Sequence, residues 1–303
     1  MKQSDTPLPL GGFQGSPLAS EISENTRRLT AINAATIEKP ERVRVFTVAN
    51  QKGGVGKTTT AVNLAVALAE KGMNVLVIDL DPQGNASTAL GIDHHAITGS
   101  IYDTLVNNVP LSDVMQQSPE SENLKCVPAN LQLARAEMDL YSMLAREYRL
   151  KNAIQQYLDA EPERPDYIFI DCPPSLGQLT VNALTAATEV LIPIQCEYYA
   201  LEGLSQLKVS IDMIKGASNP NLALSTILLT MYNSRTKLNT AVVEDVRTHF
   251  PTQTLETIIP RQIGVAEAPG FGKTVITYDR SSNGAISYME AAIEIAKKGV
   301  QHG

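Results

Sequence analysis

The chain has 303 residues, of which 43% are hydrophobic and 19% are charged, as in ordinary globular proteins. This length suits one large α/β domain or two smaller ones. We find no apolar run long enough to span a bilayer and no charged-then-apolar leader, so we expect neither a stable membrane anchor nor a secreted protein. The three cysteines and four histidines have no disulfide or zinc spacing, which fits reduced thiols in the cytoplasm.

The net charge of −7 comes from the middle of the chain. Residues 45–234 carry 11 basic and 20 acidic side chains, whereas the two ends of the chain are each close to neutral. Net charge governs solubility and steering rather than any one face. A basic, DNA-binding face in the C-terminal third therefore stays compatible with the composition.

Residues 1–42 are predicted to form a flexible N-terminal extension. Its first 17 residues are rich in proline and glycine and too poor in apolar side chains to fold alone. A short helix is expected over residues 21–31, with Arg27 and Arg28 on it. A solvated arm is the simpler interpretation, and a regulatory or DNA-touching arm is the alternative.

After residue 43, short apolar runs alternate with helical stretches. Strands are predicted at residues 45–49, 75–78, 167–170, 190–194 and 225–229, and helices at residues 58–71, 131–158 and 201–215. Unbroken apolar runs are typical of parallel strands buried on both faces. The alternation predicts an α/β fold, a doubly wound, mostly parallel sheet flanked by helices, forming a single domain over residues 43–303.

A glycine-rich loop joins the first predicted strand to the first predicted helix. Glycines allow successive backbone N–H groups to face phosphate oxygens, and the start of the helix adds its positive dipole end. Lys57 can neutralise the β and γ phosphates, and the Thr58 hydroxyl can bind magnesium. Gln51 stands at the position where an ordinary P-loop has its first glycine, and an additional lysine, Lys52, follows it. The candidate nucleotide-binding residues are Lys52, Gly53, Gly54, Val55, Gly56, Lys57, Thr58 and Thr59.

A second Gly-Lys-Thr sequence occurs at residues 272–274. No predicted strand leads into it, and residues 275–278 have a β-like rather than a helical pattern. We therefore interpret it as a loop without a phosphate site.

Acidic residues follow two of the predicted strands. Asp79 and Asp81 come after the second strand, and Asp171 follows the run at residues 167–170. Ligands of open α/β sheets lie beyond the carboxyl ends of the strands, where an aspartate can hold magnesium and another can orient the attacking water. Asp81 and Asp171 are predicted to be functional and Asp79 to be supporting.

With these motifs the sequence resembles the deviant Walker-A ATPases, and within them the ParA/Soj chromosome and plasmid partition proteins. The similarity runs from about residue 43 to residue 298. It is carried by the P-loop NQKGGVGKTTT at 50–60, DLDPQGN at 79–85, IDCPPS at 170–175, TMYNSRTKL at 230–238 and IPR at 259–261.

This resemblance implies ATP and Mg²⁺ as cofactors and an ATP-dependent homodimer. Lys52 would reach the phosphates of the partner's nucleotide, with Lys57 and Asp81 completing the catalytic set. Thr58, Asp81 and Asp171 would support magnesium. Pro260 and Gln262 would lie near adenine.

The resemblance also implies non-specific binding to double-stranded DNA, a ParB-like protein partner and a nucleoid-associated location. Arg235 and Arg261 are the predicted DNA-binding residues, with Arg247 and Lys273 as plausible neighbours. The simpler interpretation of each is a solvated surface charge. Gly264 stands where some relatives carry another arginine, so the resemblance leaves the strength of DNA binding open.

Other interpretations start from the same P-loop. A membrane-cycling ATPase of the MinD type needs a basic amphipathic C-terminal helix, but residues 286–300 look more like a helix packed on the domain. A nitrogenase-type reductase needs paired cluster cysteines, and Cys126 and Cys172 lack the glycine-rich context. An orphan ParA-like protein that positions another cargo would have the same ATPase core, whereas a purely structural DNA-binding module is disfavoured by the complete phosphate site.

Overall fold

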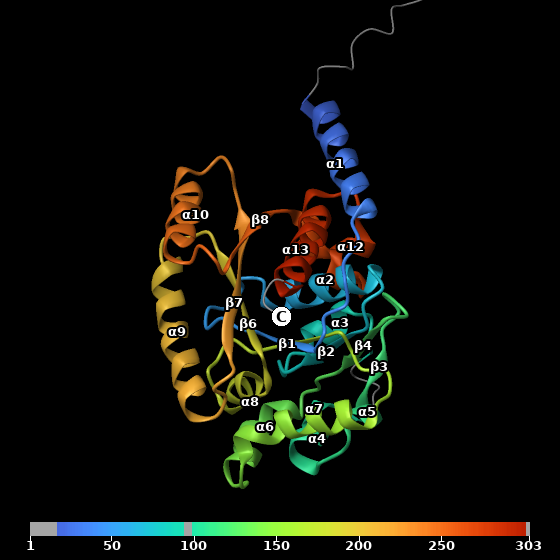
Figure 1. Cartoon of the computed structure of the whole chain (residues 1–303), viewed down its shortest axis with the longest axis vertical. Helices are drawn as coiled ribbons and strands as arrows, with labels where there is room; N and C mark the ends of the chain where they lie inside the picture. The colour runs from blue at the N-terminus through green and yellow to red at the C-terminus, as the bar shows by residue number, and fades with distance from the viewer. Residues whose placement is uncertain (1–16, 94–98, 301–303) are drawn as a thin grey trace, which may run out of the picture.

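The computed structural model describes residues 17–93 and 99–300. In these ranges an eight-stranded sheet has the order β3-β4-β2-β5-β1-β6-β7-β8, with helices on both of its faces (Figure 1). All neighbouring strands are parallel except β3 and β4. The predicted doubly wound, mostly parallel sheet is confirmed. The strands are β1 (Arg44–Val48), β2 (Val75–Asp79), β3 (Gln116–Gln117), β4 (Leu124–Val127), β5 (Tyr167–Asp171), β6 (Glu189–Gln195), β7 (Ala223–Tyr232) and β8 (Thr254–Pro260).

The sheet divides the apolar core into two clusters, one on each of its faces. Side chains alternate along each strand, so that Phe46 and Phe169 stack on one face while Val45 and Ile168 pack on the other. The first face is covered by α1 (Pro17–Ala34), α2 (Lys57–Glu70), α3 (Asn85–Ala89), α12 (Val275–Tyr278) and α13 (Asn283–Val300). The second is covered by α4 (Ile101–Asn107), α5 (Leu111–Val114), α6 (Leu133–Tyr141), α7 (Arg149–Ala160), α8 (Gln178–Ala186), α9 (Ala200–Ala217) and α10 (Lys237–His249).

Two short connecting regions complete the chain between these elements. A 3₁₀ turn, η1 (Arg146–Tyr148), precedes α7. The helix α11 (Ile263–Glu267) and the 3₁₀ turn η2 (Ala268–Phe271) link β8 to α12.

Two local predictions were wrong. The helix expected over residues 131–158 is interrupted between α6 and α7, where Ala145 has a left-handed φ of 50°. The segment expected to be β-like at residues 275–278 is instead the helical turn α12. Its start is fixed from outside, because Glu120 accepts hydrogen bonds from the N–H and hydroxyl of Thr274, and Asn63 accepts one from Val275 N. These contacts outweigh the β propensity of the segment.

Helix α1 is longer than the helix predicted at residues 21–31, and it lies against α13. Ile32 is buried in the core, and Leu29 packs beside it. Residues 17–34 thus have a fixed place in this structure, whereas residues 1–16 lie outside the described residues. The domain boundary at residue 42 stays a prediction.

The last helix, α13, is packed on the domain as expected. Its apolar side chains Tyr288, Met289 and Ile295 are buried against the first face of the sheet. Among the helices of the described ranges, none has the length and apolarity required to cross a bilayer.

A buried ion pair connects the central strands to α13. The guanidinium of Arg44, on β1, donates hydrogen bonds to both carboxylate oxygens of Glu189, on β6, at 2.7 and 2.8 Å, and to Ile295 O at 2.8 Å. The two side chains are only 12% and 16% exposed. Removing one partner would leave a charge without compensation in a site with little water.

We expect Glu189→Ala to lower the free energy of unfolding by about 3 kcal/mol, because the Arg44 guanidinium would stay buried without its partner. Urea denaturation measures this loss. The matched control is Asp212→Ala, which breaks the exposed Lys208–Asp212 pair on α9 and is expected to cost less than about 1 kcal/mol. Equal losses in the two variants would show that burial of the Arg44–Glu189 pair does not matter.

Candidate nucleotide site

The site is centred on the loop between β1 and α2, in the middle of the sheet. Gly54 and Gly56 have φ values of 75° and 91°, in the left-handed region that side-chain-bearing residues rarely adopt. A Cβ added at either position would meet no atom within 4 Å. The backbone conformation, not crowding, therefore requires glycine here, and the loop keeps an open side that an anion can approach.

Hydrogen bonds from neighbouring strands fix the loop. Thr230, near the end of β7, donates its hydroxyl to Val55 O at 2.9 Å. Asn50 donates to Pro193 O on β6 at 2.9 Å and accepts from Lys52 N at 3.0 Å. Because two strands of the sheet hold the loop at Asn50 and at Val55, its N–H groups are positioned before any ligand arrives.

Lys57 is the buried cation of the loop. Its side chain is at the first position of α2 and its Nζ donates to Lys52 O at 3.3 Å, while the residue is only 7% exposed. Burial lowers the pKa of this ammonium, and the carboxylate of Asp171 opposes that effect. An anion bound beside Lys57 would compensate the buried charge.

Three carboxylates gather at the carboxyl edge of the sheet, as the sequence predicted. Asp79 and Asp171 are register partners at the ends of β2 and β5, and both are fully buried. Ser87 donates its N–H and hydroxyl to Asp79, at 2.8 and 2.7 Å, and Asp81 N donates to Asp79 at 3.1 Å. Asp79 therefore supports the Asp81 turn, in agreement with the supporting role predicted for it.

The electrostatics of this carboxylate group favour a cation. Burial raises the pKa of Asp79 to about 6, against the hydrogen bonds from Ser87 that lower it. Burial, and then the charge of Asp79, raise the pKa of Asp171 well above its usual range. A divalent cation near them would offset both desolvation and mutual repulsion.

The donor set fits magnesium bound together with a phosphate. Thr58 donates its hydroxyl to Asp171 Oδ2 at 2.6 Å, and Asp171 Oδ1 has no hydrogen-bond partner within residues 17–93 and 99–300. In the same ranges, no group of three or more His, Cys, Asp or Glu side chains forms a ready metal cage. Magnesium often uses one or two protein oxygens and completes its shell with phosphates and water, which matches this arrangement.

Lys52 lies on the surface of the loop and forms an ion pair with Glu197, just after β6. The two side chains are 53% and 45% exposed. Strands β5 and β6 flank β1 on either side, so they deliver Asp171 and Glu197 to opposite sides of the loop. Such an exposed pair contributes little stability and can exchange partners.

The predicted DNA-binding arginines lie at the ends of the neighbouring strands β7 and β8. Tyr232 pairs with Pro260, and Arg261 N donates to Tyr232 O at 2.9 Å. Arg235, Arg247 and Arg261 are all exposed, and Arg247 also donates to Glu256 O at 2.8 Å. The structure thus brings the segments at residues 230–238 and 259–261 together.

Gln262 does not extend freely from this edge. Its amide oxygen accepts the N–H of Gly284 at the start of α13. The predicted adenine contacts of Pro260 and Gln262 stay predictions.

Comparison with known proteins decides the family. A family model described as "AAA domain" matches residues 43–224. The chromosome partitioning protein ParA of Myxococcus xanthus is 50% identical, over 84% of this chain and 88% of its own. The sporulation initiation inhibitor protein Soj of Bacillus subtilis is 47% identical, over 84% of this chain and 99% of its own. This chain belongs to the ParA/Soj family.

Solved structures share the ParA/Soj architecture. A Mycobacterium smegmatis protein named cobyrinic acid a,c-diamide synthase, with bound ADP and magnesium, is 39% identical with a TM-score of 0.71, over 83% of this chain and 93% of its own. The septum site-determining protein MinD from Pyrococcus horikoshii, complexed with Mg-ADP, is 25% identical with a TM-score of 0.67, over 83% and 95%. The fold is that of a P-loop NTPase.

Three residues of this ParA/Soj site carry roles that the sequence analysis did not assign: Ser87, Glu197 and Thr230. Glu197 follows a strand, which is the signal that identified Asp81 and Asp171, and that signal could have found it. Thr230 contacts Val55, 175 residues away in the sequence, and Ser87 contacts Asp79 across the turn after β2, eight residues away, so no periodic pattern indicates either role.

We expect Thr230→Val to weaken ATP binding about fivefold, because valine keeps the shape of threonine but cannot donate to Val55 O. Titration with a fluorescent ATP analogue measures the change. The control is Thr226→Val, the same substitution four residues earlier on β7, where the hydroxyl contacts Ser225 rather than the loop. Unchanged affinity in Thr230→Val would show that this hydrogen bond does not hold the loop.

Proposed function

We propose that this chain is a DNA-partitioning ATPase that dimerises on Mg-ATP, binds double-stranded DNA non-specifically and releases it after hydrolysis stimulated by a ParB-like protein. The observation that carries the proposal is the hydrogen bond from Thr58 to the buried Asp171, with the second carboxylate oxygen of Asp171 left unpartnered among the described residues. It lies next to a preformed phosphate loop and to Lys57. A cytoplasmic, nucleoid-associated location follows from this function.

ATP is the nucleotide that this site fits, with Mg²⁺ beside it. The N–H groups of residues 53–59 and the Lys57 ammonium would hold the phosphates, and Thr58 with Asp171 would support the metal. Magnesium neutralises charge on the β and γ phosphates when bound. The support comes from the loop geometry and from relatives solved with ADP or an ATP analogue and magnesium.

Asp81 is the residue that we assign to the attacking water. It follows β2 by two residues, is half-buried, and accepts Gln83 N at 3.0 Å. Its backbone N–H is held by the buried Asp79, so the turn that carries it is well anchored. Intrinsic hydrolysis should be slow, as in switch ATPases whose sites are completed by a partner.

Lys52 is the residue that we assign to the dimer. In the single chain it pairs with Glu197 at the surface. In the proposed homodimer it would leave that weak pair for the phosphates of the partner's nucleotide. The nucleotide then becomes part of the interface, and dimer stability depends on it.

The variants Lys52→Ala and Asp81→Ala should separate dimerisation from hydrolysis. We expect Lys52→Ala to bind ATP but stay monomeric, because its cross-interface charge is gone. We expect Asp81→Ala to dimerise with ATP but hydrolyse it at least 100-fold more slowly. Light scattering and phosphate release measure the two steps. A normal ATP dimer of Lys52→Ala, or normal turnover of Asp81→Ala, would remove the corresponding role.

The proposed DNA surface is the edge formed by the ends of β7 and β8. Arg235 and Arg261 are exposed there, and residues 235–303 are nearly neutral although the chain is acidic. A local arginine pair can contact phosphates irrespective of net charge, and each contact adds to the salt dependence of binding.

We expect ATP-dependent, salt-sensitive binding of the unaltered chain to non-specific duplex DNA, absent with ADP or without nucleotide. Arg235→Glu should dimerise normally yet lose at least tenfold in DNA affinity, because it replaces a phosphate-binding cation by an anion. Fluorescence anisotropy across a salt series gives both the affinity and its salt dependence. Arg164→Glu, an exposed arginine before β5, is the matched control. Retained DNA binding in Arg235→Glu would place the surface elsewhere.

The alternative function is that of an orphan ParA-like or MinD-like ATPase that positions a division or membrane-associated scaffold. Such an ATPase would have the same nucleotide site. The result that would distinguish it is ATP binding without DNA binding in any nucleotide state.

A further inference from the structure

Helix α1 precedes the part of the chain that the family model covers. That model begins at residue 43, whereas α1 spans Pro17–Ala34. The alignment with the Bacillus subtilis relative uses 99% of that protein but 84% of this chain. This chain therefore contains residues without a counterpart in that relative, and α1 needs an explanation of its own.

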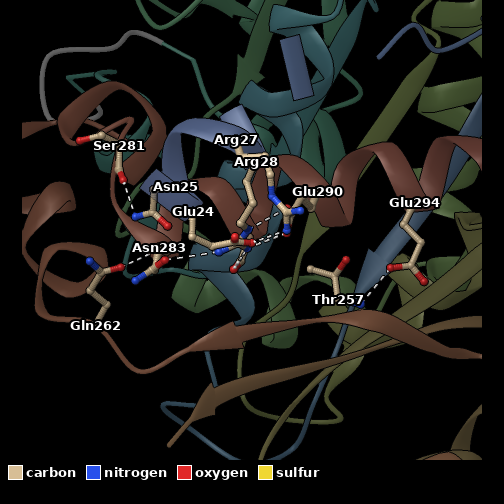
Figure 2. A network of polar contacts seen from close by, with 12 residues as sticks. Glu24, Asn25, Arg27, Arg28, Thr257, Gln262, Ser281, Asn283, Glu290 and Glu294 are labelled. Atoms are coloured by element: carbon tan, nitrogen blue, oxygen red, sulfur yellow. Dashed lines mark hydrogen bonds and ion pairs between the residues drawn. The ribbon is translucent and has the colours of Figure 1, made fainter. Parts of the chain in front are cut away.

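Arg28 is the main polar contact between α1 and α13. Its guanidinium donates to both carboxylate oxygens of Glu290 at 2.9 and 2.6 Å and to Ser287 Oγ at 3.2 Å (Figure 2). It also donates to Asn283 Oδ1 at 3.3 Å. The pair is partly buried, and a two-pronged guanidinium–carboxylate contact fixes orientation as well as distance.

Helix α1 contacts the start of α13 next to the turn between β8 and α11. Asn283 is held from α1 by Arg28 and by Glu21, whose carboxylate accepts Asn283 Nδ2 at 2.7 Å. The next residue, Gly284, donates its N–H to Gln262 Oε1. A Cβ at Gly284 would lie 2.5 Å from Val265 Cγ2, so the first turn of α13 and α11 are in close contact. Figure 2 shows Gln262 beside Asn283 at this junction.

The other end of α1 is tied to the helix that follows the phosphate loop. Lys71, directly after α2, donates its ammonium to Ala35 O at 2.7 Å and to Ile32 O, at the C-terminal end of α1. The Ile32 side chain is buried in the cluster that contains α2 and α13. One helix thus spans from the C-terminal end of α2, whose first turn carries Lys57 and Thr58, to the junction that carries Gln262.

We propose that α1 is a brace for base recognition: it fixes the turn at residues 260–262 relative to the phosphate loop, and Arg28 is its positioning residue. The inference rests on the proposed ATP site and on the prediction that Pro260 and Gln262 contact its adenine. Loosening α1 leaves the phosphate loop intact, since β6 and β7 hold that loop. The binding energy that is lost when α1 is loosened therefore comes from contacts to the base.

The test is displacement of a fluorescent ATP analogue from the full chain with magnesium, by ATP, GTP and inorganic tripolyphosphate. We expect Arg28→Ala to weaken ATP about threefold or more and to reduce the preference for ATP over GTP, while tripolyphosphate affinity stays unchanged. Arg27→Ala is the matched control, because Arg27 is the adjacent residue, is 79% exposed and pairs within α1 with Glu24. The charge exchange Arg28→Glu with Glu290→Arg should restore the preference for ATP.

Two outcomes would overturn the brace alone: an unchanged ATP preference in Arg28→Ala, or an equal loss for all three competitors, which indicates a general structural role. Failure of the unaltered chain to bind ATP would overturn the proposed function and this inference with it. If Arg28→Ala does not fold, Glu290→Gln keeps the side-chain size, removes the charge that holds Arg28 and gives the same test.

Discussion

The hydrogen bond between Thr58 and Asp171 joins the first turn of α2 to the end of β5, and the site is arranged around it. It directs one carboxylate oxygen of a fully buried aspartate at a threonine hydroxyl. It also ties the residue that follows the phosphate loop to the end of a central strand. Two buried aspartates on neighbouring strands are unfavourable by themselves, since each is desolvated and each repels the other. The two buried carboxylates lie where a metal and a phosphate can compensate their desolvation and repulsion. Ionisable groups with perturbed pKa values commonly gather at functional sites for this reason.

The order of the strands explains how residues distant in the sequence meet. With β1 between β5 and β6, the loop after β1 has Asp171 on one side and Glu197 on the other. Strand β7, next to β6, then supplies the hydroxyl of Thr230 to Val55 O in the loop. The topological switch of a doubly wound sheet is where such a crevice is expected. The acidic middle of the chain thus builds the metal side of the site, whereas the exposed arginines come from the C-terminal third.

Much of this architecture could be predicted from the sequence because the central strands are unbroken apolar runs and the loop has a spacing that needs glycines. Strands β3, β4 and β8 were not predicted. β3 consists of two residues, both exposed, and β4 consists of only four residues, so neither is long enough to give a periodic signal. The interruption of the helix predicted over residues 131–158 falls at Ala145, in a stretch without glycine or proline that would mark it. The helical turn at Val275–Tyr278 depends on contacts from elsewhere in the chain, which local propensity does not contain. The same limit applies to Ser87, Thr230 and the docking of α1.

The hydrogen bond from Thr230 to Val55 has a further consequence. Thr230 lies two residues before the end of β7, and Arg235 follows that end by three residues, so the contact to the phosphate loop and the exposed arginine belong to one short stretch of backbone. Between them Met231 has a left-handed φ of 54°, a conformation that a side-chain-bearing residue holds only when its surroundings fix it. The backbone between Thr230 and the residues that lead to Arg235 is thus held in an uncommon conformation. A change in the backbone of residues 230–232 would therefore reach both the phosphate loop and the segment that leads to Arg235.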